Sequence, residues 1–370
     1  MSRPWLRPLG AALAATLLGC GAIEERDGRR EVDRFSALLL VDPHWIGPTQ
    51  DAETELPTLP EVLAPLLGAE ESNVALSQWL DAWADESDAP PAFRADLLCP
   101  WLRADATNGC DATCAFCVER RLDAASEPFR LIALAYRPDL ALVNGSVRGQ
   151  GELRLVYAVT RARQREVELP MSVIVELPLA ARVSARQWAE RFHALSALRD
   201  DPRLFRRGLR VLVDDARAVD APASVNVRVR DALHSDGRML AFRPHAGRLR
   251  RASLQDTIDL ALQSTRELEA TFASARADGA GALEVPEQLW AERVDRHSGW
   301  PQLADAKLSR ALRLQSCHGC HADEHSLDGF HIAPGAVGRA RVSRFLHDPE
   351  DLANDELSRR EDALRTLLAL

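Results

Sequence analysis

Residues 151–160, GELRLVYAVT, decide the fold class of this 370-residue chain. The stretch is short, rich in Leu, Val and Tyr, and begins at a glycine. Residues 128–142, PFRLIALAYRPDLAL, and residues 171–179, MSVIVELPL, have the same character and are also separated by Gly or Pro. Such runs are typical of β-strands. The three stretches therefore predict successive strands of one sheet.

Helical patterns lie on both sides of these strands. In residues 59–87 the apolar side chains of Leu76, Trp79, Leu80 and Trp83 recur at helical spacing, which indicates a core face. Residues 184–200, SARQWAERFHALSALRD, begin at a capping serine and predict an amphipathic helix. Residues 223–233, ASVNVRVRDAL, alternate as a half-exposed strand does.

Strands and helices mix without a regular βαβ alternation, so we expect an α+β domain with a mixed sheet and packed helices over residues 35–285. A Gly/Ala-rich break near residue 280 is the predicted domain boundary. The chain has 55 acidic and 46 basic residues, a net charge of −9, which argues against a nucleic-acid partner.

The N-terminus predicts export and a lipid anchor. Arg3 and Arg7 precede a ten-residue apolar run, which is the length of a signal-peptide core and too short to span a bilayer. The run ends in Leu-Leu-Gly-Cys20, which resembles the lipobox of bacterial lipoproteins, although Leu18 stands where a smaller residue is commoner. This resemblance implies a signal peptide over residues 1–19, lipidation of Cys20 and a charged tether over residues 20–34. The alternative is a plain signal peptide with a coincidental cysteine.

The residue after Cys20 is Gly21 rather than Asp, which in lipoproteins favours the outer over the inner membrane. We therefore expect a protein of the bacterial cell envelope, attached to a membrane through lipid.

Four further cysteines, Cys99, Cys110, Cys114 and Cys117, form an even set in an oxidising compartment. The last three copy the spacing by which radical-SAM enzymes bind an iron–sulfur cluster. Such clusters are assembled in a reducing cytosol, whereas this chain carries an export signal. The sequence therefore favours two local disulfides and leaves their pairing open.

Residues 314–339, LQSCHGCHADEHSLDGFHIAPGAVGR, contain the pattern C-x-x-C-H at Cys317, Cys320 and His321. This pattern is the attachment signal for c-type haem. Two thiols one helical turn apart add to the two vinyl groups of the porphyrin, and the adjacent histidine binds the iron.

The surroundings of this motif, residues 295–370, resemble a minimal class I cytochrome c. The resemblance implies a small all-α module in which the carbonyl of Pro334 orients the proximal His321. It also implies a terminal helix, here ELSRREDALRTLLAL with Leu364, Leu367 and Leu368 on one face. Such cytochromes commonly use methionine as the sixth ligand, but no methionine follows the motif. His347 and His331 are the two candidates for that position.

Zinc is the alternative metal for this segment. Cys317, Cys320 and His321 with either His325 or His331 form a possible tetrahedral set. The zinc interpretation explains the cysteine pair but not the order of the motif, the proline or the terminal helix. A plain disulfide is the other alternative.

Much of the chain also resembles an uncharacterised family of secreted bacterial lipoproteins, through the three strand stretches, WAERFHALSAL and CHGCH…GFHIAP…SRFL. The resemblance to this family implies no activity, and the sequence contains no catalytic motif. Two hypotheses remain. The first is an electron carrier with covalent haem and a periplasmic redox partner. The second is an envelope binding or scaffold protein whose C-x-x-C-H segment is a zinc or disulfide staple.

Overall fold

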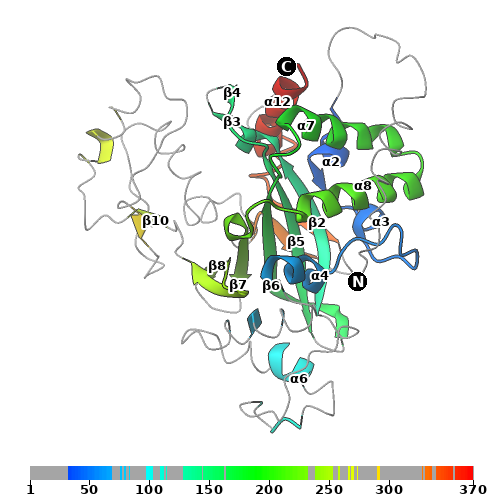
Figure 1. The fold of residues 1–370 in the computed structure, drawn as a ribbon, viewed down its shortest axis with the longest axis vertical. Coiled ribbons are helices and arrows are strands. Elements are labelled where there is room, and N and C mark those ends of the chain that lie inside the picture. The colour runs from blue at the N-terminus through cyan, green and yellow to red at the C-terminus, as the bar shows by residue number, and fades with distance from the viewer. Residues whose placement is uncertain are drawn as a thin grey trace, which may run out of the picture. The chain divides into compact units, whose positions relative to one another are not determined.

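A seven-stranded sheet forms the centre of the protein, and it is antiparallel throughout rather than mixed as expected (Figure 1). From Val32 onward the chain belongs to one compact unit. The computed structural model describes residues 32–68, 76, 79–80, 83, 97–102, 109–111, 114, 128–143, 145–161, 164–231, 238–252, 257–258, 266, 268–270, 273, 290–291, 327, 330–335, 339–352 and 355–369.

Neighbouring strands of the sheet follow one another along the chain, in the order β1-β2-β5-β6-β7-β8-β9. The predicted strand stretches are confirmed as β2, β5 and β6, which pair antiparallel in that order. The bounds are Leu39–Leu40 for β1, Phe129–Arg137 for β2, Glu152–Arg161 for β5, Gln164–Pro178 for β6, Asn226–Asp231 for β7, Arg238–His245 for β8 and Arg248–Ala252 for β9.

Three short strand pairs accompany the sheet. They are β3 (Leu142–Val143) with β4 (Ser146–Val147), β10 (Thr257–Ile258) with β11 (Trp290–Ala291), and β12 (Ile332–Pro334) with β13 (Ala340–Val342). The β10–β11 pair joins residues on either side of the break near residue 280, which itself lies outside the described residues. The predicted boundary at that break therefore stays a prediction.

Helices cover one face of the sheet, which we call the apolar face. Alternate residues of the strands, such as Leu155, Val175 and Val227, point to this face and are fully buried. They share one core with the helices. The helices and 3-10 turns are α2 (Arg34–Ala37), α3 (Pro43–Ile46), α4 (Leu59–Leu67), α6 (Cys99–Leu102), η4 (Pro138–Ala141), α7 (Ala185–Ala194), η5 (Leu195–Leu198), α8 (Pro202–Arg217), η6 (Pro222–Ser224) and α12 (Glu356–Ala369).

The predicted helix at residues 184–200 is confirmed as α7 and η5. The Ser184 hydroxyl accepts a hydrogen bond from the Gln187 backbone N–H (3.2 Å), and the Gln187 side chain accepts one from the Ser184 backbone N–H. This capping box satisfies donors that the first turn of a helix leaves unpaired. The helical pattern predicted in residues 59–87 begins with α4. This helix is capped at its C-terminus by Gly68 in the left-handed conformation. Leu76, Trp79, Leu80 and Trp83 are fully buried, as expected of a core face.

We call the opposite face of the sheet the charged face. The sequence predicted that residues 223–233 form a half-exposed strand, but this face is covered. Strand β7 alternates as predicted, but its polar side is covered: Arg230 is only 8% exposed and lies over the Phe330 ring. Ile332 and Ala340 of the β12–β13 pair pack on the apolar part of this face, around Ile132 and Val156.

The predicted terminal helix is confirmed as α12, but its place is not that of a cytochrome module. Leu357, Leu364 and Leu367 are fully buried in the same core as the sheet and α7. Among the described residues, no separate all-α C-terminal module is evident. The C-terminal helix is instead part of the mixed α+β body (Figure 1).

Candidate functional site

The C-x-x-C-H segment lies outside the described residues, as do the lipobox Cys20 and Cys117. The attachment of haem to Cys317 and Cys320, its ligation by His321 and the lipidation of Cys20 therefore stay predictions. His331, Pro334 and His347, the downstream residues of the predicted site, are all described, and they belong to the same compact unit as the sheet.

Ser343 links the two histidines. Its backbone N–H donates to the carbonyl of His331 (2.9 Å), and its own carbonyl accepts from the backbone N–H of His347 (3.1 Å). Ser343 is fully buried. The two candidate distal ligands therefore belong to one local cluster, which we call the histidine cluster and define as His331, Ser343, Phe345, His347 and Asp355.

The imidazole of His347 is held by a carboxylate. Its Nδ1 lies 3.2 Å from Oδ2 of Asp355, a side chain with no exposed surface. Asp355 is fixed in turn, because Ser358 donates its backbone N–H to Oδ1 and Arg34 lies 3.5 Å from Oδ2. The ring of His347 also meets Phe35 edge to face, with centroids 5.0 Å apart. This arrangement engages Nδ1 and leaves Nε2 as the nitrogen for a ligand.

His331 lies beside a hydroxyl rather than a carboxylate. Its ring stacks on Phe345 with centroids 4.4 Å apart, and its Nδ1 lies 3.4 Å from the Ser343 hydroxyl. A hydroxyl can serve either as donor or as acceptor, so it fixes the tautomer less firmly than a carboxylate does.

Pro334 is the last residue of β12, opposite Ala340 in the ladder with β13. Residues 335–339 link the two strands in the sequence, and the structure describes Gly335 and Arg339 of them. The Cβ of any residue at Gly335 would meet the Arg339 carbonyl at 2.4 Å, which explains the glycine. Whether the Pro334 carbonyl faces the His321 imidazole stays a prediction, since His321 lies outside the described residues.

Within the part of the chain that the structure describes, no three His, Cys, Asp or Glu side chains come together as metal ligands.

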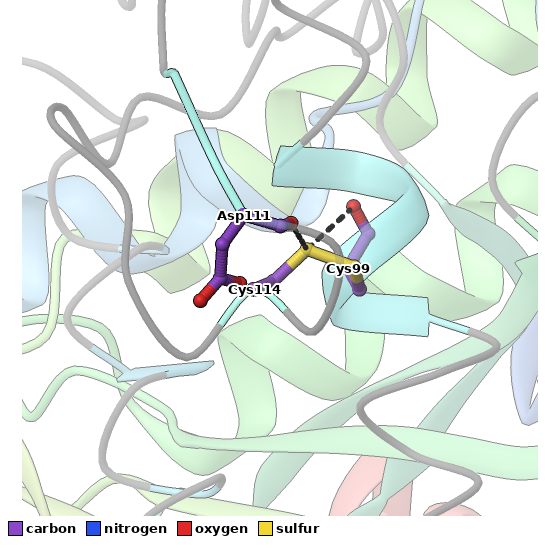
Figure 2. Close-up of a disulfide and its surroundings, with 3 residues drawn as sticks. All are labelled: Cys99, Asp111 and Cys114. Atoms are coloured by element: carbon purple, nitrogen blue, oxygen red, sulfur yellow. Dashed lines mark hydrogen bonds between the residues drawn. A yellow bond between two sulfur atoms is a disulfide. The ribbon is translucent and has the colours of Figure 1, made fainter.

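The cysteines near residue 110 form disulfides, as the sequence favoured. Cys99 and Cys114 are joined, with their Cα atoms 5.4 Å apart (Figure 2). Cys114 Sγ lies 3.7 Å from the carbonyl oxygen of Cys99 and 3.9 Å from that of Asp111. Cys110 is disulfide-bonded as well. With Cys114 bonded to Cys99, the cluster spacing of Cys110, Cys114 and Cys117 does not describe three free thiolates.

Sequence reasoning missed a network of buried charges on the charged face of the sheet. Its centre is Asp139 of η4, which accepts two hydrogen bonds from Arg137 (2.9 and 2.7 Å) and one from Arg359 of α12 (2.9 Å). Arg359 also bonds Glu356 in the first turn of α12 (2.7 Å). We call this the ion network; its members are Arg137, Asp139, Glu152, Arg154, Glu176, Arg228, Glu356, Arg359 and Arg360.

The strands supply the rest of the network. Arg154 of β5 stands opposite Glu176 of β6 in the ladder, and their side chains lie 3.1 Å apart. Arg228 of β7 donates to the same carboxylate (2.9 Å). The sequence contained a signal for these ion pairs across the strands, because charged residues alternate with Leu or Val in β5, β6 and β7.

Burial and charge act against each other in this network. Burial opposes ionisation of Asp139, but the adjacent Arg137, Arg360 and Arg359 outweigh it and hold the pKa of Asp139 well below its usual value. The pKa of Glu356 is lowered for the same reason, by Arg360 and Arg359.

Arg360 behaves differently. Burial, followed by repulsion from Arg137, lowers its pKa to about 9, and Glu356 offsets this only in part. Its two contacts with Glu356 are both long, at 3.4 Å. Arg360 is therefore the network's least well compensated charge.

Comparison of the chain with protein-family models, with curated proteins and with solved structures found no match. Among the described helices, none is both long enough and apolar enough to cross a membrane.

Proposed function

We propose that this protein is a lipid-anchored electron carrier of the bacterial envelope, with a c-type haem bound covalently to Cys317 and Cys320. His321 is the proximal ligand of the iron. The observation that carries the proposal is the C-x-x-C-H order of residues 317–321, because covalent haem attachment requires two thiols and a histidine in that arrangement.

The histidine cluster supports the proposal by offering a suitable distal ligand. A ligating imidazole commonly donates its other ring N–H to a carboxylate, which fixes the tautomer and makes the ligand more basic. His347 has this partner in Asp355 at 3.2 Å. We therefore propose His347 as the sixth ligand. His331, whose partner is the hydroxyl of Ser343, is the second candidate.

The position of His347 gives the α+β body a role in the proposal. Asp355 and Phe35 belong to the body, and they hold the imidazole of His347 in one orientation. The segment with the two thiols lies between β11 and β12 in the sequence. In this proposal the haem lies against the body rather than in a module of its own.

A haem iron supplies a one-electron couple, and the residues around it set the potential and access. Two histidine ligands lower the potential relative to a histidine–methionine pair. In this proposal the body would cover the side of the haem that His347 ligates, and a periplasmic redox partner would receive or supply the electron. Lipid on Cys20 keeps the carrier at the membrane.

Electrochemistry of the full-length protein, exported in a host that matures c-type cytochromes, tests the carrier. We expect a reversible one-electron wave and a six-coordinate low-spin spectrum. His347→Ala should convert the spectrum to five-coordinate high-spin, whereas the matched His331→Ala should leave it six-coordinate. The opposite outcome for the two variants would transfer the role of distal ligand to His331.

Covalent haem without any reversible wave would contradict the carrier. A protein that holds zinc or a disulfide at Cys317 and Cys320 would support the envelope scaffold instead.

A further inference from the structure

The β3–β4 pair forms a small hairpin with apolar side chains in solvent. Its turn contains Gly145, whose φ of +73° is the left-handed conformation that tight hairpin turns require. Val147 lies opposite Leu142 and Val143 opposite Ser146, so the two valines stand on opposite faces of the hairpin. Val143 is 39% exposed, Val147 is 44% exposed, and Leu140 in the adjoining η4 is 45% exposed.

This hairpin has a rigid base. The turn η4, which leads into β3, holds the buried Asp139, and that carboxylate is bonded to Arg137 of the sheet and Arg359 of α12. The backbone N–H of Arg148, just after β4, donates to the carbonyl of Ala141 (2.8 Å). Exposed apolar residues on a fixed base lose little conformational entropy when they meet a partner.

The folded body begins beside α12, the helix that also contacts the base of the hairpin. Val32 is buried, and two residues later Arg34 forms ion pairs with Asp355 (3.5 Å) and with Glu361 of α12 (2.5 Å). The helix α12 therefore contacts the start of the chain at Arg34 and the base of the hairpin at Asp139.

Twelve peptide units separate the proposed lipid anchor at Cys20 from Val32. Fully extended, such a tether reaches about 40 Å. A lipid anchor at Cys20 therefore limits the distance of Val32 from the bilayer to about 40 Å. The exposed hairpin lies at the α12 end of the body, which Arg34 also contacts (Figure 1).

We propose that the β3–β4 hairpin is a membrane-contact surface, in which Leu140, Val143 and Val147 enter the interfacial layer of the bilayer that holds the lipid anchor. The proposal rests on the lipid anchor of the proposed function. The exposed Arg148 suits anionic headgroups. The net charge of −9 makes general electrostatic adsorption unfavourable, so the apolar side chains carry the contact.

Vesicle co-sedimentation of the unlipidated chain from Gly21 onward separates this surface from the anchor, and residues from Val32 onward form their own compact unit. The probe is vesicles of phosphatidylethanolamine and phosphatidylglycerol. We expect Val143→Asp/Val147→Asp to lower the partition coefficient about tenfold, because buried methyl groups are replaced by charge. The matched control is Leu204→Asp/Val211→Asp on α8, whose side chains are 50% and 39% exposed. It should bind as the parent does.

Equal loss in both double variants, or no binding by the parent chain, would overturn the membrane-contact surface. A near-UV circular dichroism spectrum equal to the parent's verifies folding of each variant. Slower amide exchange at residues 145–148 in the presence of vesicles is the expected second readout, and unchanged exchange there would also count against the proposal. Cell fractionation of the full-length protein and of Cys20→Ala tests the anchor separately, since neither vesicle sample contains lipidated protein.

Discussion

The two faces of the seven-stranded sheet are formed by the same strands but held in different ways. On the apolar face, Leu155, Val175 and Val227 pack against helices without any polar contact. On the charged face, the neighbouring positions Arg154, Glu176 and Arg228 form ion pairs at 2.9–3.1 Å. The apolar face gains its stability from removal of surface from water, which is not directional.

The charged face has a different role, because a buried ion pair gains little net free energy after the cost of desolvation. Its hydrogen bonds are directional. Asp139, already bonded to Arg137, can accept from Arg359 only when α12 docks in a register that brings the two side chains together. We infer that the apolar face supplies most of the stability and that the ion network determines where the C-terminal helix sits.

The largest expected effect is on the apolar face. Phe192 of α7 is fully buried and stacks on Tyr136 of β2, with centroids 4.1 Å apart. Phe192→Ala should lower the free energy of unfolding by about 4 kcal/mol, because it removes the ring and leaves a cavity. Denaturant unfolding measures this, and Phe192→Leu, which keeps much of the volume, should lose clearly less. Equal losses would mean that the packing of this face is not the dominant contribution.

On the charged face, removal of one partner should cost slightly less. Arg137→Met leaves Asp139 buried with one fewer cation, and we expect a loss of about 3 kcal/mol in denaturant unfolding. The control is Arg182→Met, since Arg182 and its partner Asp220 are both about half exposed. This control should change stability by less than about 0.5 kcal/mol. A small effect for Arg137→Met would refute the view that the network holds α12.

Acid should weaken the charged face and spare the apolar one. Asp139, Glu176 and Glu356 have pKa values held below their usual range by arginines. A carboxylate with a lowered folded pKa stabilises the fold above its unfolded pKa, near 4, and this contribution is lost as the pH falls through the folded value. We expect the free energy of unfolding to fall by about 2 kcal/mol between pH 6 and pH 3. In Asp139→Asn the slope should be shallower; an unchanged slope would exclude Asp139 as a source.

The smallest effect should come from Arg360. Burial lowers its pKa to about 9, so the folded state disfavours its charge at neutral pH. Arg360→Met removes that charge while Glu356 keeps Arg359 and Arg137 as partners. We expect thermal unfolding at neutral pH to change by no more than about 1 kcal/mol, toward higher stability. A loss as large as that of Arg137→Met would show that the network acts as one unit.

The sheet and its main helix were predictable because their signals are local. Alternating Leu, Val and Tyr at residues 151–160 mark a strand, and Ser184 with Gln187 marks a helix start. The pairing of Cys99 with Cys114 was not predictable, since it depends on how α6 folds back toward residue 114.

The place of α12 was also beyond the sequence. Leu364 and Leu367 predict an apolar helix face, but they do not say which core that face enters. The deciding contacts are Asp139 with Arg359, separated by 220 residues, and such pairs have no local signature. The partner of His347 was missed for a related reason, because no local pattern distinguishes Asp355 from any other polar residue before a helix.

The comparison of the two faces does not test the proposed haem, which depends on Cys317, Cys320 and His321. The pyridine haemochrome spectrum of denatured, washed full-length protein, exported in a host that matures c-type cytochromes, tests it most directly. The account predicts a c-type α-band that survives denaturation and disappears in Cys317→Ala/Cys320→Ala. A blank spectrum from folded, correctly exported protein would contradict it.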